Sequence, residues 1–207
     1  MNAQDETAEP PGPPPPAVGD AVGAAVLAER LRGLAPSCGP VRLVGIDGHA
    51  GSGKSTLARA LAAALGGAPV LHLDDFASHE RFFGWTECFA AHVLAPFARG
   101  EPAVFRPYDW DARRPGRTRT VAAAPVVLVE GVGVGRRALR PSLSLLWWMD
   151  LAGEAAWERG RERDGSGLAD FWDDWERAEA AHFRADPSRP FADALVRQCG
   201  EGYVLRE

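Results

Sequence analysis

The stretch Gly48–Ser55 reads GHAGSGKS and contains Lys54, the only lysine of the chain. It fits the pattern G-x-x-x-x-G-K-[S/T] at every position. Glycines let the backbone curl until several N–H groups point at one phosphate, and a helix that starts here adds partial positive charge. The compact ammonium of Lys54 can bridge two phosphates, which a planar guanidinium cannot do, and the hydroxyl of Ser55 suits Mg²⁺. We therefore expect nucleotide binding by Gly48, Ala50, Gly51, Ser52, Gly53, Lys54, Ser55 and Thr56.

Three carboxylates follow two other apolar runs. Asp74 and Asp75 lie near the end of PVLHLDDF (Pro69–Phe76), and Glu130 ends the run VVLVE. A carboxylate in such a place can accept a proton from an attacking hydroxyl or hold a Mg²⁺ ion. A strand-end turn or a helix cap is the alternative for the aspartate pair. From the spacing alone, either aspartate can be the base.

Arginines follow the fourth apolar run, in AAWERGRERD. Arg159 and Arg163 are four residues apart and so share one face of a helix. A lid that carries them would neutralise the charge of a phosphoryl group in transfer and exclude water. The alternative is a solvated helix face, since 22 of the 23 basic residues are arginines.

These side chains need a scaffold of alternating strands and helices. Continuous apolar strands that alternate with helices predict a mainly parallel sheet covered on both faces, whose ligands bind at the carboxyl ends of the strands. Two glycines, Gly66 and Gly67, should end the helix after the phosphate loop. We expect strands at 41–46, 69–76, within 121–131, 143–150 and 202–206, and helices at 20–35, 54–65, 154–163 and 168–184. The segment up to Ala98 should be mostly helical.

The composition of the chain argues against several other classes of protein. The chain has 207 residues, a net charge of −5 and no basic block, which argues against a general nucleic-acid surface. Three widely spaced cysteines match no metal-binding pattern, and no apolar run is long enough to cross a bilayer. We expect a cytoplasmic protein with one domain over residues 20–207. Residues 1–19, which include PPGPPPP, should be a disordered proline-rich tail rather than a partner-binding segment.

Taken together, the ordered motifs resemble the uridine kinase family, within the group that also holds phosphoribulokinase and bacterial pantothenate kinase. The resemblance spans roughly residues 41–196. It implies an α/β P-loop fold, a three-layer α/β/α sandwich with a helical lid. It rests on IDGHAGSGKSTLA (Ile46–Ala58), Asp74–Phe76, RPYDWDARR (Arg106–Arg114), VVLVEGVG (Val126–Gly133), ERGRERD (Glu158–Asp164) and Ala192–Val196.

The resemblance also implies roles for single residues. Asp74, rather than Asp75, would be the general base and would lie near Mg²⁺, with Ser55 and Glu130 completing the metal shell. Tyr108 would face the acceptor. Arg159 and Arg163 would be the lid arginines that act in catalysis with Asp74 and Lys54.

Two departures from the family pattern bear on the acceptor. Arg113 stands near the position where these kinases usually carry a histidine beside the pyrimidine, so we assign Arg113 to substrate binding. Ala156 replaces a further lid arginine.

Three other features remain open at this level. His49, inside the phosphate loop, is interpreted as a spacer rather than a catalytic group. GVGVG (Gly131–Gly135) lacks the full dinucleotide pattern and is interpreted as a flexible strand-to-helix loop. The tryptophans Trp85, Trp110, Trp172 and Trp175 could line an acceptor pocket, although packing in a core is the simpler role for each.

The sequence therefore predicts a kinase that uses ATP and Mg²⁺ to phosphorylate a hydroxyl of a small molecule, most simply a nucleoside such as uridine or cytidine. A same-fold kinase of a pantothenate-like or sugar-like acceptor is one rival. A nucleotide-binding regulatory protein with little transfer activity is the other. No nucleic-acid or membrane partner is expected, and a homo-oligomer is left open.

Overall fold

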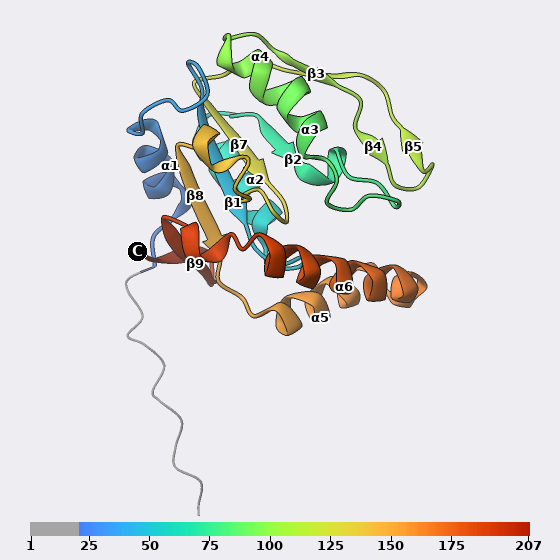
Figure 1. Cartoon of the computed structure of the whole chain (residues 1–207). Helices are drawn as coiled ribbons and strands as arrows, with labels where there is room; N and C mark the ends of the chain where they lie inside the picture. Colours follow the sequence, from blue (N-terminus) through green and yellow to red (C-terminus); the bar gives the residue numbers. More distant parts are fainter. Residues whose placement is uncertain (1–20) are drawn as a thin grey trace, which may run out of the picture.

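The chain is built around a six-stranded sheet in the order β10-β9-β8-β1-β7-β2 (Figure 1). The computed structural model describes residues 21–207, so the expected tail at 1–19 lies outside the described residues. Neighbouring strands run parallel except β10, which pairs antiparallel with β9. The strands are β1 (Arg42–Asp47), β2 (Val70–His72), β7 (Val126–Glu130), β8 (Leu145–Met149), β9 (Ala194–Cys199) and β10 (Gly202–Arg206).

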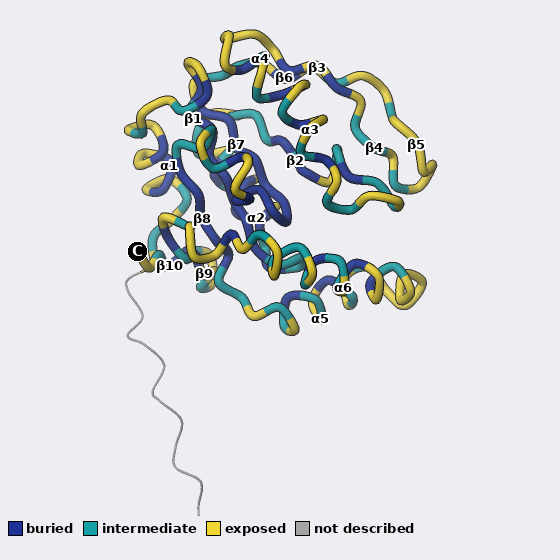
Figure 2. The backbone as a smooth tube through the Cα atoms, viewed as in Figure 1, coloured by how far each residue is buried: buried dark blue, intermediate teal, exposed yellow. Residues whose placement is uncertain are grey.

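The central strands are buried on both faces because their side chains alternate between two separate cores. Val127 and Val129 of β7 join one apolar cluster, whereas Val126 and Leu128 join the other. Helices α1 (Ala24–Arg32) and α2 (Lys54–Ala64) cover the second cluster. A continuous helical segment covers the first, with α3 (Thr86–Phe89), a π-helical turn (Ala90–Leu94) and α4 (Ala95–Ala98). Figure 2 shows the buried strands between these partly exposed helices, and the predicted three-layer α/β/α fold is confirmed.

Helix α2 begins at the phosphate loop and ends where its glycines require. Gly53 caps its start with φ 99°. Gly66 and Gly67 have φ of 78° and 92°, and their N–H groups donate to the carbonyls of Ala63 and Ala62. These bonds satisfy carbonyls that have no partner inside the helix, so the predicted stop is confirmed.

Two helices extend from the carboxyl edge of the sheet and form the lid hairpin, defined here as α5 (Gly153–Asp164) and α6 (Ala169–Ala185). A short 3₁₀ turn at Ser166–Leu168 joins them. Figure 1 shows the pair below the sheet, facing the segment that carries β4 and β5 across a gap. Within residues 21–207, none of the helices is long and apolar enough to cross a membrane.

Several boundaries differ from the sequence prediction. The strand expected over 69–76 stops at His72 and becomes a 3₁₀ turn at Leu73–Asp75, and the helix expected over 20–35 covers only Ala24–Arg32. The helical stretch begins at Thr86, because residues 77–85 form turns. Two small antiparallel pairs were not predicted: β3 (Ala103–Phe105) with β6 (Arg119–Val121), and β4 (Tyr108–Asp109) with β5 (Arg114–Pro115).

Candidate active site

The phosphate loop connects β1 to α2 and is held by backbone geometry that only glycine adopts easily. Gly48, Gly51 and Gly53 have φ of 142°, 83° and 99°. The Lys54 side chain folds back over this loop, where Nζ donates to the carbonyl oxygens of Gly48 at 3.0 Å and of His49 at 2.9 Å. Lys54 is only 7% exposed. Its charge is therefore held at the mouth of the loop before any phosphate arrives.

Glu130 lies beside the phosphate loop because β7 is the neighbour of β1. Its Oε1 accepts a hydrogen bond from Ser55 Oγ at 3.0 Å and lies 2.5 Å from His72 Nδ1 on β2. Burial opposes ionisation of Glu130, but the bond to His72 and the charge of Lys54 outweigh it, so its pKa is lowered. The bond to Glu130 in turn raises the pKa of His72. Glu130 is thus an ionised carboxylate in contact with the loop serine.

The two neighbouring aspartates occupy different environments. Asp75 Oδ2 forms an ion pair with Arg119 Nη1 at 3.0 Å. Asp74 instead reaches solvent through a cavity, while the surrounding protein atoms and the charge of Glu130 raise its pKa to about 6. A group with that pKa is mostly ionised at neutral pH and can still take up a proton. The 3₁₀ turn therefore places Asp74 in the cavity wall and Asp75 in an ion pair, although burial raises the pKa of Asp75 as well.

Three hollows line up along the carboxyl edge of the sheet, each with a volume of a few hundred cubic ångströms. The phosphate hollow, about 310 Å³, is lined by Gly51, Gly53, Lys54, Ser55, Thr56, Arg159 and Arg163. The outer hollow, about 420 Å³, shares Arg159 with the phosphate hollow and also includes Ser52, Asp150, Leu151, Arg197 and Gln198. The aromatic cavity, about 320 Å³, includes Ala50, Asp74, His79, Trp110, Asp111, Arg163, Asp164, Phe171, Trp172 and Trp175.

The lid arginines connect these hollows in a fixed order. Arg159 lines both the outer and the phosphate hollow, and Arg163 lines both the phosphate hollow and the aromatic cavity. Arg163 is bound to Asp164, with Nε and Nη2 at 2.6 and 2.9 Å from its carboxylate oxygens. Arg161 takes the opposite side of α5 and pairs with Glu176 and Asp173 of α6. The helical spacing thus places the two predicted arginines around the phosphate hollow and excludes the third.

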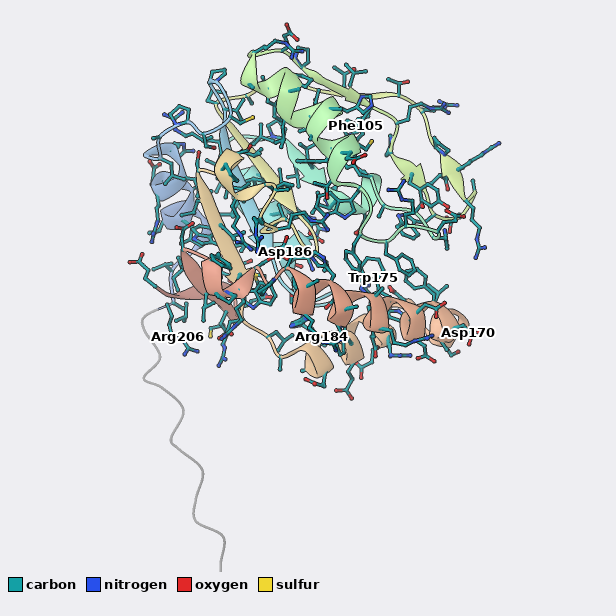
Figure 3. All side chains as sticks on the ribbon, in the orientation of Figure 1. Phe105, Asp170, Trp175, Arg184, Asp186 and Arg206 are labelled. Atoms are coloured by element: carbon teal, nitrogen blue, oxygen red, sulfur yellow. The ribbon has the colours of Figure 1, made fainter. Side chains whose placement is uncertain are left out.

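The aromatic cavity lies between the lid hairpin and the β4 segment. Trp175 rises from α6 towards that segment (Figure 3), and its ring centroid lies 5.1 Å from that of Phe82. On the other wall, Trp110 Nε1 donates to the carbonyl of Asp74 at 3.2 Å. Of the four tryptophans considered from sequence, Trp110, Trp172 and Trp175 line the cavity. Trp85 lies in the core beneath the guanidinium of Arg136.

The remaining predicted acceptor residues do not line the cavity. Tyr108 is one shell away, where its hydroxyl lies 3.0 Å from Nδ1 of the lining residue His79. Arg113 is exposed in the turn between β4 and β5, with φ 51°. Tyr108 therefore contacts a residue of the cavity wall, whereas Arg113 is not among the residues that line the cavity.

Sequence reasoning missed Asp47, the last residue of β1, and this changes the interpretation of GVGVG. Asp47 is fully buried and accepts hydrogen bonds from the N–H groups of Gly48, Gly133 and Gly135 at 2.7, 2.9 and 2.8 Å. The prediction of a flexible strand-to-helix loop was wrong. Residues 131–135 are buried and anchored to Asp47, and the chain reaches β8 through turns without an α-helix.

Sequence reasoning also missed Glu179 of α6, which is fully buried against the phosphate loop. Its Oε1 lies 2.6 Å from His49 Nδ1, and its Oε2 accepts the Ala50 N–H at 3.1 Å. A sequence signal existed, since Trp172, Trp175 and Glu179 share a helix face and an acid interrupts that apolar stripe. His49 and Ala50 thus both contact the lid hairpin from the phosphate loop.

Ser55 of the phosphate hollow, its partner Glu130, and Asp74 of the aromatic cavity are oxygen donors of the kind that suits Mg²⁺. Ser55 contributes a hydroxyl, and Glu130 and Asp74 contribute carboxylates, all oxygen ligands of the kind hard cations prefer. Across residues 21–207, His, Cys, Asp and Glu side chains form no cluster of three or more that could hold a metal by itself. A site of this type suits an ion that arrives with phosphates and keeps part of its water.

No protein-family model and no curated protein matches the sequence. Solved structures do match. A possible uridine kinase from Bacillus stearothermophilus superimposes with a TM-score of 0.62 at 18% identity, over 82% of this chain and 95% of the other. This chain has the fold of the P-loop kinases. A "putative fructose transport system kinase" from Silicibacter sp. TM1040 also matches, with a TM-score of 0.55 and 23% identity, over 83% of this chain and 95% of the other.

Proposed function

We propose that this protein is a kinase that uses ATP and Mg²⁺ to phosphorylate a hydroxyl group of a small molecule. One observation carries the proposal: Arg159 and Arg163 join three hollows in a row, with the phosphate loop in the middle. A donor in the outer hollow would place its phosphates in the loop. An acceptor in the aromatic cavity would then meet the terminal phosphate beside Asp74.

Each residue then has a definite task in the transfer. Asp74 takes the proton of the acceptor hydroxyl, for which its pKa of about 6 is suited. Lys54 leaves the carbonyls of Gly48 and His49 and bridges the phosphates. Arg159 and Arg163 stabilise the charge that spreads over the transferring group.

Ser55, Asp74 and Glu130 would hold the metal ion. Mg²⁺ supplies neutralisation of the phosphate charge when it is bound there. The ionised state of Glu130 and its contact with the hydroxyl of Ser55 prepare these oxygen donors before the ion arrives.

A nucleoside is the acceptor that we propose first. The flat rings of Trp110, Phe171 and Trp175 line the cavity and provide stacking surfaces for a planar base. The two solved structures with similar folds differ in the acceptor that their names suggest, a nucleoside in one and a sugar in the other. A sugar-like acceptor is therefore the rival to be tested.

An acceptor panel with γ-labelled ATP tests the proposal. Uridine, cytidine, fructose and pantothenate are each incubated with the wild-type protein, Mg²⁺ and labelled ATP, and label transfer is measured. We expect transfer to a nucleoside. Transfer only to fructose or pantothenate would rule out a nucleoside as the acceptor. Nucleotide binding without transfer to any acceptor would favour a regulatory protein.

The matched pair Asp74→Asn and Asp75→Asn tests the base. Both changes remove one carboxylate from the same turn, but only Asp74 lines the aromatic cavity. We expect Asp74→Asn to retain ATP binding and to lose transfer by about 10²–10⁴-fold, with a small effect for Asp75→Asn. Equal transfer in the two variants would remove Asp74 as the base.

A further inference from the structure

Glu179 is a buried carboxylate that collects hydrogen bonds from three parts of the chain. Its Oε1 accepts from Trp157 Nε1 of α5 at 2.9 Å and lies 2.6 Å from His49 Nδ1 of the phosphate loop. Its Oε2 accepts from Trp175 Nε1 of α6 at 2.9 Å and from the Ala50 N–H at 3.1 Å. Both oxygens are therefore fully occupied, and each joins the phosphate loop to one helix of the lid hairpin.

Such a carboxylate is costly to bury, and its surroundings offset that cost. Burial alone would raise the pKa of Glu179, but the bond with His49, the charge of Lys54 and the Ala50 N–H outweigh it and lower the pKa. Glu179 is thus held as an anion next to a loop that would bind phosphate anions. Since the charge itself disfavours phosphate, the benefit of this arrangement must lie in what it does to the loop.

The phosphate loop also packs closely against the lid hairpin at Gly51 and at His49. A Cβ atom built on Gly51 would lie 1.9 Å from the carbonyl oxygen of Ala156 on α5. The ring of His49 meets Trp148, Trp157 and Phe183 edge-on, with centroid distances of 5.3–5.6 Å. Ala156, which stands where the family resemblance implies an arginine, is itself fully buried.

We propose that Glu179 is a positioning residue that fixes the phosphate loop in its binding shape and ties it to the lid hairpin. The Ala50 N–H points at Glu179 and so sets the path of the backbone just before the glycines that curl around phosphate. Trp157 lies two residues before Arg159, so the same carboxylate also sets the height of that arginine above the phosphate hollow. The inference rests on nucleotide binding, the first step of the proposed function.

The variant Glu179→Gln tests this role with little change in volume. An amide has one oxygen, so its NH₂ group must face either the Ala50 and Trp175 N–H donors or the Trp157 N–H donor. Glu176→Gln is the matched control, because Glu176 lies on the same helix and pairs with Arg161 away from the loop. The dissociation constants of Mg·ADP and of tripolyphosphate are measured, together with the thermal unfolding midpoint.

We expect Glu179→Gln to bind both probes roughly tenfold more weakly or worse, at a temperature where it is folded. Glu176→Gln should bind both as the wild type does. Tripolyphosphate carries no base, so a weaker affinity for it reports on the phosphate hollow, which the loop and the lid arginines line together. Wild-type affinities in Glu179→Gln, with only a lower unfolding midpoint, would overturn the proposal.

Two milder variants carry the test if Glu179→Gln does not fold. Trp157→Phe and Trp175→Phe each keep an aromatic ring and remove one hydrogen bond to Glu179. Each should bind tripolyphosphate a few-fold more weakly, and unchanged affinity in both would refute the positioning role. Failure of the wild-type protein to bind either probe would instead refute the proposed function.

Discussion

The close approach of α5 to the phosphate loop makes a sharp prediction for Gly51→Ala. Gly51 has φ 83°, and an added Cβ would lie 1.9 Å from the carbonyl oxygen of Ala156. The backbone conformation alone costs an alanine about 1–2 kcal/mol. To relieve this overlap, α5 must also move by about 1 Å, because carbon and oxygen atoms that are not bonded do not approach so closely.

Gly53→Ala is a control in the same loop. Gly53 has φ 99°, yet an added Cβ would meet nothing nearer than Met149 at 3.6 Å. Both variants are therefore destabilised by the left-handed backbone conformation, but only Gly51→Ala displaces α5. That displacement stretches the bond from Trp157 to Glu179, and a hydrogen bond to a charged group contributes about 1.5–3 kcal/mol.

The assay compares Mg·ADP affinity and urea unfolding for the wild type and the two alanine variants. We expect Gly51→Ala to lose at least about tenfold more affinity than Gly53→Ala, in line with the difference of about 1.5–3 kcal/mol. Its free energy of unfolding should fall further by a similar amount. Equal losses in the two variants would show that α5 does not rest on the loop, and the reasoning would fail.

Two further changes probe the charge at the phosphates and the pH dependence of stability. Lys54→Arg preserves the charge, but a guanidinium fits poorly in the buried space between Gly48 and His49, so we expect labelled-phosphate transfer to fall at least about 10²-fold; near wild-type transfer would contradict this. His182 stacks on Phe83, and burial, followed by the charge of Arg136, lowers its pKa from 6.5 to about 4. Because the unfolded chain then binds the proton first, the free energy of unfolding should fall by about 2 kcal/mol from pH 7 to pH 5. In His182→Phe, the free energy of unfolding measured in urea should no longer show this fall between pH 7 and pH 5. An unchanged pH dependence would show that His182 does not cause it.

The phosphate loop could be predicted from sequence because its chemistry is local. Eight consecutive residues specify the curl of the backbone, the lysine and the serine, and apolar runs on either side specify the strand and the helix. The position of Glu130 could be predicted for the same reason, since it ends an apolar strand. Its contact with Ser55 required only that the two strands be neighbours, which is usual in a parallel sheet.

The aspartate pair shows where local reasoning stops. Asp74 and Asp75 are adjacent and chemically identical, so spacing alone could not separate them, and the family resemblance supplied the preference for Asp74. The structure separates them through Arg119, 44 residues further along the chain, which pairs with Asp75 alone. That pairing depends on the small β3–β6 pair, which carries no strong periodic signal.

Long-range burial of charge explains the two main omissions. Glu179 binds His49 across 130 positions in the sequence, and Asp47 binds Gly133 across 86. In neither pair does the local sequence around one residue indicate its partner. The sequence gives one hint of these contacts, a carboxylate inside an apolar stripe or strand. It indicates that the buried carboxylate needs hydrogen-bond donors, but not which residues supply them.

Lys54 gives the molecule a built-in reporter. It is the only side-chain amine in the chain and sits almost buried in the phosphate loop. A reagent that acylates amines can therefore mark a single side chain, and the rate of marking measures how often that loop opens. A protease that cleaves after lysine has one target bond, between Lys54 and Ser55, in the first turn of α2. Cleavage there would count local unfolding events at the site itself, without any engineered label.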